Sequence, residues 1–339
     1  MTSNPSSCNP EKFEFRGIHP KVFMGTASDR YAGWIGQIYS PGRYDNRITH
    51  RSHKVGKQSF GEEVLPVESV EEYFVHFAVL EIDYTFYRPL LDKDGKPTEN
   101  YRVLMEYKKH LHKNDRLILK VPQVVFAQKI RKGDKYATNE EFLNPKVFFD
   151  QFYKPANDLL DPNLTGLIFE QEYQRKDKRL PIVKIASVLD DFFKTIPPDT
   201  RYHIELRTDS YLTNPVFEVL EKHGIGQVLS HWTWLPTLKR QWLKSGFRFF
   251  NKGKEVIIRL MTPLGVRYED AYAQAFPFNK LVEGMMQHEM VEETAELMQK
   301  GLKQGIKVNV IINNRAGGNA PMIAQLVAKR FLLTEKNWF

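Results

Sequence analysis

Eight apolar segments typical of β-strands alternate with amphipathic helical segments along most of this 339-residue chain. Repeated strand–helix units predict a parallel sheet covered by helices. With eight strands, the expected fold is a single-domain α/β protein, an eight-stranded parallel (β/α)8 TIM barrel. A doubly wound open sheet is the main alternative, but no dinucleotide-type glycine fingerprint follows the first strand. The predicted strands are Lys21–Ser28, Phe77–Phe86, Leu117–Gln123, Thr165–Glu172, Arg201–Arg207, Gly226–Trp232, Glu255–Met261 and Lys307–Asn313.

Apolar residues at helical spacing predict the segments between these strands. One of these helices opens at Asn214-Pro215 and closes at Gly224, a helix-ending residue. Residues 1–20 are expected to form a flexible tail, and residues 21–339 the barrel, with a basic loop insertion near 43–66. The other predicted helices are Val67–His76, Asn100–His112, Pro145–Leu160, Pro181–Thr195, Leu238–Lys244, Val291–Lys303 and Pro321–Leu333.

Composition narrows the class of protein. The chain has 49 lysines and arginines against 41 acids, so its formal net charge of +8 favours anionic partners. Its only cysteine is Cys8, which excludes a disulfide framework and a cysteine-based zinc site. The sequence has no apolar signal segment at its start and no run of about 18 apolar residues, so we expect a cytoplasmic protein without a membrane partner.

Polar side chains stand at the predicted C-terminal ends of the strands, where a barrel carries its active site. Alternation along Leu80–Arg88 predicts that Glu81 and Asp83 share one strand face. The main alternative is a structural salt-bridge network that closes the barrel top. The predicted catalytic residues are Glu81, Asp83 and Glu205, and the predicted substrate-binding residues are Lys120, Arg207, Arg259, Asn313, Asn314, His231 and Glu170.

Loops on the same face are rich in cations, which predicts an electropositive mouth. They follow the first, third and fourth strands and include Arg43, Lys129 and Arg175. The turn Asn313–Pro321 contains two glycines and either binds phosphate or simply joins strand to helix. A metal centre is not predicted, although His231 with nearby acids is a conceivable ligand set. Aromatic residues that could stack on a base or a sugar, or only anchor loops, are Tyr31, Trp34, Tyr39, Trp232 and Trp234.

Several motifs together resemble the YecE-like family, in family order from about residue 21 to 331. The motifs are Gly25-Thr26 with Tyr31, Gly33-Trp34 and Tyr39; Glu81-x-Asp83-x-Thr85-Phe86-Tyr87; Lys120-x-Pro122; Glu205-x-Arg207; Arg259-Leu260; and Asn313-Asn314 with Gly317 and Asn319-Ala320. The resemblance implies a (β/α)8 barrel and no assigned reaction. The family barrel is similar to the xylose isomerase and endonuclease-IV-like group, which suggests phosphate or nucleic-acid chemistry by analogy.

The chain departs from the family pattern in four places. Glu170-Gln171-Glu172 replaces a usual Gln-Leu-Pro, and the usual aspartate after strand six is replaced around Ser230-His231. Met261 stands where a histidine is usual, and roughly Tyr44–Leu65 is inserted in the first loop. These changes suggest a divergent branch with its own ligand.

The residues favour an enzyme, hydrolase-like or isomerase-like, that acts on a phosphate-bearing or otherwise anionic substrate. Glu81 and Glu205 would act in acid–base chemistry, while Lys120, Arg207 and Arg259 would hold the anion. The first alternative is a non-catalytic nucleic-acid-binding protein that uses the basic loops, and the second is a structural barrel with an inert pocket. No motif specifies a cofactor, a reaction or an oligomeric state.

Overall fold

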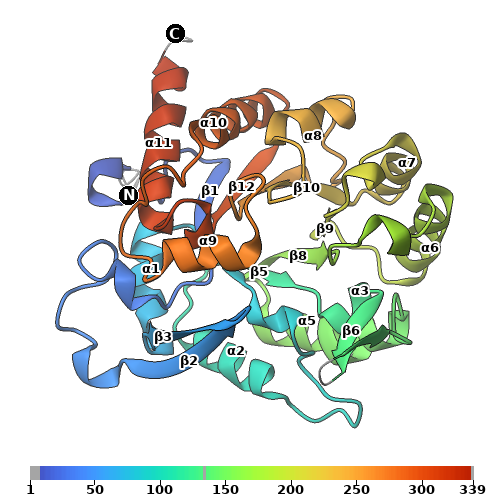
Figure 1. The fold of residues 1–339 in the computed structure, drawn as a ribbon, viewed down its shortest axis with the longest axis horizontal. Helices are drawn as coiled ribbons and strands as arrows, with labels where there is room; N and C mark the ends of the chain where they lie inside the picture. Colours follow the sequence, from blue (N-terminus) through green and yellow to red (C-terminus); the bar gives the residue numbers. More distant parts are fainter. Residues whose placement is uncertain (1–7, 133–134, 337–339) are drawn as a thin grey trace.

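The computed structural model describes residues 8–132 and 135–336, and its centre is a closed barrel of eight parallel strands. β1 pairs with β4 on one side and with β12 on the other, which closes the sheet (Figure 1). The predicted eight-stranded (β/α)8 barrel is therefore confirmed. The barrel strands are β1 (Val22–Ala27), β4 (Val79–Ile82), β5 (Arg116–Lys120), β8 (Leu164–Glu170), β9 (Tyr202–Glu205), β10 (Gly226–His231), β11 (Glu255–Leu260) and β12 (Lys307–Ile312).

Helices surround the barrel and follow its strands in the order that the sequence predicted (Figure 1). Gly224 ends α7 with a φ of 70°, the left-handed conformation that glycine adopts readily. None of the helices in the described residues is long and apolar enough to cross a membrane. The helices are α1 (Val70–His76), α2 (Glu99–Lys109), α3 (Gln123–Phe126), α4 (Pro145–Phe148), α5 (Lys154–Leu160), α6 (Ile182–Thr195), α7 (Asn214–His223), α8 (Leu238–Lys244), α9 (Tyr268–Ala275), α10 (His288–Lys303) and α11 (Ala320–Lys336).

Shorter turns complete the helical structure. A π-helical turn, Phe149–Tyr153, joins α4 to α5, so the single helix predicted over Pro145–Leu160 is continuous but locally widened. The 3-10 turns are Pro10–Lys12, Ala32–Trp34, Asp45–Arg47, Val67–Ser69, Tyr84–Phe86, Lys176–Lys178, Asp209–Tyr211 and Asn314–Ala316.

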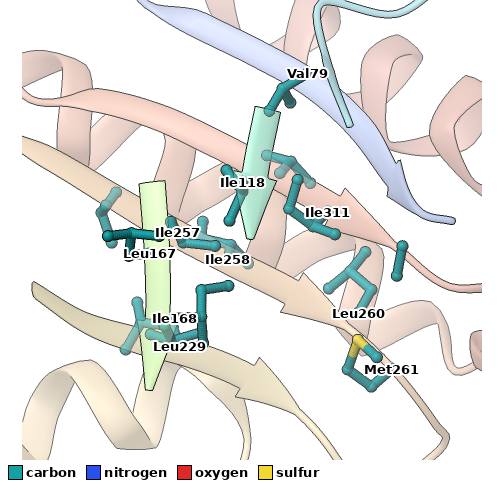
Figure 2. Close-up of a cluster of buried hydrophobic side chains, with 14 of the residues drawn as sticks. Val79, Ile118, Leu167, Ile168, Leu229, Ile257, Ile258, Leu260, Met261 and Ile311 are labelled. Atoms are coloured by element: carbon teal, nitrogen blue, oxygen red, sulfur yellow. The ribbon is translucent and has the colours of Figure 1, made fainter. Parts of the chain in front are cut away.

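Apolar side chains fill the barrel below its mouth. Val79, Ile118 and Ile257 are buried there, each two residues before a charged residue on the same strand (Figure 2). Because side chains at i and i+2 share a strand face, Glu81, Lys120 and Arg259 continue the same inward-facing rows toward the C-terminal ends. The charged side chains therefore lie above the apolar ones, at the C-terminal end of the barrel.

The insertion near 43–66 folds as an antiparallel hairpin, β2 (Thr49–Val55) and β3 (Gln58–Val64). It packs on α9 through Val55 and Phe60, with the Phe60 ring 4.9 Å from the Tyr272 ring. A second hairpin, β6 (Lys129–Lys132) and β7 (Lys135–Thr138), follows β5. Sequence patterning predicted neither hairpin nor α9, because each is short and packs against a small separate cluster or the rim of the mouth.

The flexible tail predicted for residues 1–20 does not extend over residues 8–20. Phe15 is completely buried, and the Arg16 guanidinium donates to Asp115 Oδ1 at 2.8 Å. The first turn, Pro10–Lys12, lies beside α11 (Figure 1). This segment is ordered because it covers apolar surface at the N-terminal end of the barrel, whereas residues 1–7 lie outside the described residues.

The strand predicted over Phe77–Phe86 is also shorter than expected, because β4 ends at Ile82 and Tyr84–Phe86 form a 3-10 turn. The Thr85 hydroxyl lies 3.2 Å from the carbonyl of Ile82 and 2.8 Å from that of Lys120, which fixes the turn beside the end of β5. Glu81 and Asp83 therefore do not share a strand face. The alternating pattern was misleading because a helical turn can carry the same residues.

Candidate functional site

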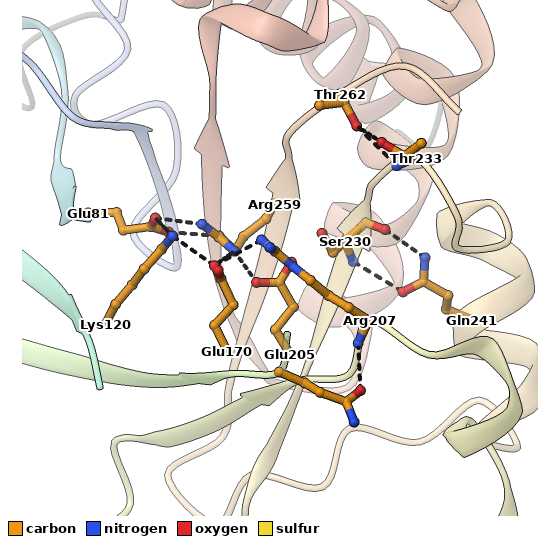
Figure 3. Close-up of polar contacts among 11 residues, drawn as sticks. Glu81, Lys120, Glu170, Glu205, Arg207, Ser230, Thr233, Gln241, Arg259 and Thr262 are labelled. Carbon is orange, nitrogen blue, oxygen red and sulfur yellow. Dashed lines mark hydrogen bonds and ion pairs between the residues drawn. The ribbon is translucent and has the colours of Figure 1, made fainter. Parts of the chain in front are cut away.

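A buried cluster of charged side chains occupies the C-terminal end of the barrel, centred on Arg259 of β11 (Figure 3). Arg259 Nη2 and Nε donate to the two oxygens of Glu81 at 2.6 and 2.8 Å. Arg259 Nη1 donates to Glu170 Oε2 at 3.0 Å and also to Glu205. One guanidinium from β11 therefore binds carboxylates from β4, β8 and β9.

Two further cations join this cluster from the side of the mouth. Lys120 Nζ lies 2.7 Å from Glu170 Oε2, and Arg207 Nη2 lies 2.9 Å from the same oxygen. Arg207 Nε is also 3.4 Å from Glu205. Three carboxylates thus face three cations, and this balance offsets the cost of burying charge. Six of the ten predicted site residues meet here, and they form the salt-bridge network that the sequence offered as an alternative.

The environment separates the pKa values of two carboxyls in this cluster. Burial raises the pKa of Glu81 above its ordinary value, although Arg259 and Lys120 oppose the shift. Burial acts in the same direction on Glu170, but Arg207, Lys120 and Arg259 together hold its pKa below the ordinary value. The Glu170 carboxylate therefore stays ionised at neutral pH.

A cavity of about 620 Å³ lies directly above the cluster. Lys120, Glu170 and Arg207 line it, whereas Glu81, Glu205 and Arg259 are fully buried and do not. Asp83, predicted with Glu81 and Glu205 to be catalytic, does line the cavity and accepts a hydrogen bond from Ser28 Oγ at 2.8 Å. Other lining residues include Phe86, Tyr87, Gln123, Gln128, Lys129, Tyr136, Glu172, Tyr173, Arg175, Lys178, Trp232, Met261, Tyr268 and Arg315.

Arg315, which the sequence prediction omitted, is a partly buried cation in the cavity wall. Its guanidinium carbon lies 4.5 Å from the centre of the Tyr268 ring, and its Nε has no hydrogen-bond partner. Within residues 8–132 and 135–336, no ion pair joins Arg315 to a carboxylate, although Asp83 acts on it electrostatically. The signal for Arg315 was its place after Asn313-Asn314 at the end of the last strand.

The two asparagines predicted to bind substrate serve the fold. Asn313 Oδ1 accepts from the Arg315 amide at 3.0 Å, and Asn314 Oδ1 accepts from Trp34 Nε1 and from the Ala320 amide. Neither lines the cavity. The backbone amides of Gly317 and Gly318 both donate to the Asn314 carbonyl, at 3.2 and 2.6 Å. These two donors are therefore used within the turn, as in a turn that simply joins strand to helix.

His231 lies away from the charged cluster. Its Nδ1 is 2.9 Å from the Thr262 carbonyl, and it does not line the cavity. Burial lowers the pKa of His231 to about 4, so the ring is neutral at pH 7. In the part of the chain that the structure describes, no three histidine, cysteine or carboxylate side chains are grouped in a way that could hold a metal ion. Arg259 lies among Glu81, Glu170 and Glu205, where their charges would otherwise attract a cation.

Glu172 is a second cavity residue that the predicted site omitted. Burial raises its pKa, and its Oε1 accepts from the Gln128 amide at 2.7 Å, while its Oε2 has no partner. The sequence named Glu172 as a departure from the family pattern and as one of the acids that could join His231 in a metal site, but not as a substrate-binding or catalytic residue. It thus adds a carboxyl with a raised pKa to the cavity wall.

The basic loops differ in what they contribute to the mouth. Lys129, Arg175 and Lys178 line the cavity. Three arginines of the first loop instead pair with acids: Arg43 with Glu72, Arg47 with Glu68 and Arg51 with Glu62. No cation of the insertion lines this cavity.

The aromatic residues singled out in the sequence also divide into two groups. Trp34 and Tyr39 are buried in the core, and Tyr31 packs against Trp34 and Phe278. Trp232 lines the cavity, with the Arg207 guanidinium 4.9 Å from its ring centre. Of these five residues only Trp232 lines this cavity, and Trp234, two residues later in the sequence, is exposed.

A closed parallel barrel with its polar cluster at the C-terminal strand ends places the chain in the TIM-barrel class. Within that class, the model described as "Protein of unknown function DUF72" matches residues 23–338. The chain therefore belongs to the DUF72 family, which is the YecE-like family that its motifs resemble. No curated protein matches the sequence.

Solved structures of the same family share the fold. A DUF72 protein (EF0366) from Enterococcus faecalis V583 has a TM-score of 0.54 at 17% identity, over 92% of this chain and 95% of that one. A DUF72 protein (TM1631) from Thermotoga maritima MSB8 has a TM-score of 0.51 at 15% identity, over 92% and 99%. At these identities the similarity establishes the barrel alone, so function must be argued from this chain's own site.

Proposed function

We propose that the barrel mouth is an enzyme site for a phosphate-bearing or otherwise anionic substrate. The observation that carries this proposal is Arg315, a partly buried guanidinium that lines the cavity without an ion pair to any described acid. A cation held in a partly dry site without a carboxylate partner is costly, and an anionic ligand would remove that cost. Arg315 is the anchor for the anion in this proposal.

Lys120 and Arg207 give the anion a second contact at the cavity floor. Both line the cavity, but their charges are largely balanced by Glu170 and Glu205. They are therefore suited to orient an anionic group and to stabilise charge that develops during a reaction.

Asp83 and Glu172 are the acid–base candidates that a substrate in this cavity could touch. The raised pKa of Glu172 supports a role as proton donor, and its Oε2 is unpartnered. The acid–base role predicted for Glu81 and Glu205 is replaced in this proposal by a positioning role, because both hold Arg259 and are fully buried. Proton transfer of this kind serves hydrolase-like and isomerase-like reactions alike, and the predicted cytoplasmic location suits either.

Calorimetric titration with inorganic pyrophosphate tests the anion site. Loss of a charge-assisted hydrogen bond corresponds to about a tenfold weakening or more, so we expect Arg315→Gln to bind pyrophosphate at least tenfold less tightly. Arg102→Gln is the matched control, because Arg102 lies exposed on the outer helix α2. Equal affinity in the wild type and Arg315→Gln would refute the proposed role of Arg315.

The nucleic-acid-binding alternative has weaker support. Arg43, Arg47 and Arg51, which would have extended a basic surface over the insertion, are paired with glutamates. Lys129, Arg175, Lys178 and Arg315 instead line a cavity, which suits a small anionic ligand better than a duplex.

A further inference from the structure

A second cavity, of about 630 Å³, adjoins the first and takes no part in the proposed function. Tyr173, Trp232 and Tyr268 line both cavities and therefore form the partition between them. The rest of its wall comes from the tip of the β2–β3 hairpin, from Trp234 and from the beginning of α9. Each cavity alone is large enough to hold a small molecule. Because a partition separates them, a ligand that occupies both must have two groups, one for each cavity.

A row of neighbouring aromatic rings, with a guanidinium at one end, connects the cavities. The Arg207 guanidinium lies 4.9 Å from the Trp232 ring centre, Trp232 lies 5.9 Å from Tyr173, and Tyr173 lies 6.0 Å from Trp234. Trp232 is buried, but Tyr173 and Trp234 are 44% and 46% exposed. The row therefore begins at an anion-binding cation and ends in two solvent-exposed rings, which are favourable platforms for a planar group.

The wall of the second cavity also carries exposed polar side chains, both cationic and acidic. Arg267, Glu269 and Asp270 stand at the start of α9, and Lys57 and Gln58 stand at the hairpin tip. These side chains supply hydrogen-bond donors and acceptors. A nucleobase offers the matching mixture on its edge, together with a π-face that stacks on an indole.

We propose that the second cavity binds the base of a nucleotide whose phosphate occupies the first cavity. This inference rests on the proposed function, because it needs the anion to sit beside Arg207, Lys120 and Arg315. It adds the ligand class: a flat heteroaromatic ring linked to phosphate, with Trp234 and Tyr173 as the stacking platform. Trp234 is then a specificity-determining residue at the mouth.

Calorimetric titrations with adenosine 5′-monophosphate, ribose 5-phosphate and inorganic pyrophosphate test this inference. We expect the wild type to bind the nucleotide at least fivefold more tightly than ribose 5-phosphate. Trp234→Ala should weaken nucleotide binding at least fivefold and leave pyrophosphate binding unchanged, and Trp234→Phe should keep most of the nucleotide affinity. Leu243→Ala is the matched control, since Leu243 is an exposed apolar residue on α8.

The outcomes separate this inference from the proposed function. Equal affinity for ribose 5-phosphate and the nucleotide, or an unchanged nucleotide affinity in Trp234→Ala, would overturn the base-binding site while pyrophosphate still bound through Arg315. Absence of pyrophosphate and nucleotide binding in the wild type would overturn both. A thermal melt of each variant confirms folding, and the exposed position of Trp234 makes a folded Trp234→Ala protein the expected result.

Discussion

Replacing Arg259 by methionine should strongly destabilise the barrel, because this side chain neutralises three carboxylates that come from three strands. After the change, Glu81 would keep only Lys120, at 4.0 Å, and Glu205 would keep only Arg207, at 3.4 Å. Removing one partner from a buried ion pair costs about 3–5 kcal/mol. We therefore expect Arg259→Met to lower the free energy of unfolding by about 3–5 kcal/mol, a large part of a typical domain's total.

The same reasoning predicts that Glu81→Gln lowers the free energy of unfolding in the wild type but not in the Arg259→Met background. In the wild type, Glu81→Gln removes the charge from a carboxylate that accepts two hydrogen bonds from Arg259, at a cost of about 1.5–3 kcal/mol. In the Arg259→Met background the Glu81 charge is a liability, so Glu81→Gln should be neutral or stabilising. The two substitutions should thus be non-additive by about 2 kcal/mol or more.

Urea unfolding followed by tryptophan fluorescence measures all four proteins of this cycle. A pH series adds a further check, because burial already raises the pKa of Glu81 in the folded state and loss of Arg259 would raise it more. A carboxyl with a raised folded pKa takes up its proton on folding, so Arg259→Met should recover part of its lost stability as the pH falls. Additive losses within about 0.5 kcal/mol would refute the reasoning.

Two other substitutions test separate parts of the fold. Burial raises the pKa of Asp29 from 3.8 to about 6, so the native state binds more protons than the unfolded state in this window and stability should fall by about 2 kcal/mol as the pH rises from 4 to 6. Asp29→Asn, which keeps an acceptor for the Tyr107 hydroxyl, should remove that part of the pH dependence in urea titrations, and an unchanged slope would contradict the assignment. Phe15→Ala should lower the free energy of unfolding by about 3–5 kcal/mol, whereas Lys12→Ala should leave it nearly unchanged if residues 8–20 belong to the core.

The sequence specified the barrel because its signals are local. Strand and helix periods can be read over about ten to fifteen residues. Six of the eight barrel strands lie within the predicted segments, and β5 and β8 each begin one residue earlier than predicted. The wrong predictions also arose from local patterns. The alternation after Ile82 fits a strand and a 3-10 turn equally well, and the segment around Phe15 has no periodic pattern although its side chains are buried. The hairpins and α9 were missed for the same reason, since short elements carry little periodic signal.

Charged residues at the strand ends could likewise be named from the sequence, and six of them do meet in one cluster. Which of them a ligand can reach is a tertiary property. Glu81 and Arg259 are 178 positions apart in the chain, and their pairing buries both, while Asp83, only two residues from Glu81, faces the cavity. Arg315 is unpaired for the converse reason, because no acid of the described chain folds close enough to form an ion pair with it. The sequence by itself therefore determined the scaffold and the end of the barrel that carries the polar residues. Only the packing of distant strands decided which charges neutralise one another and which stay available to a ligand.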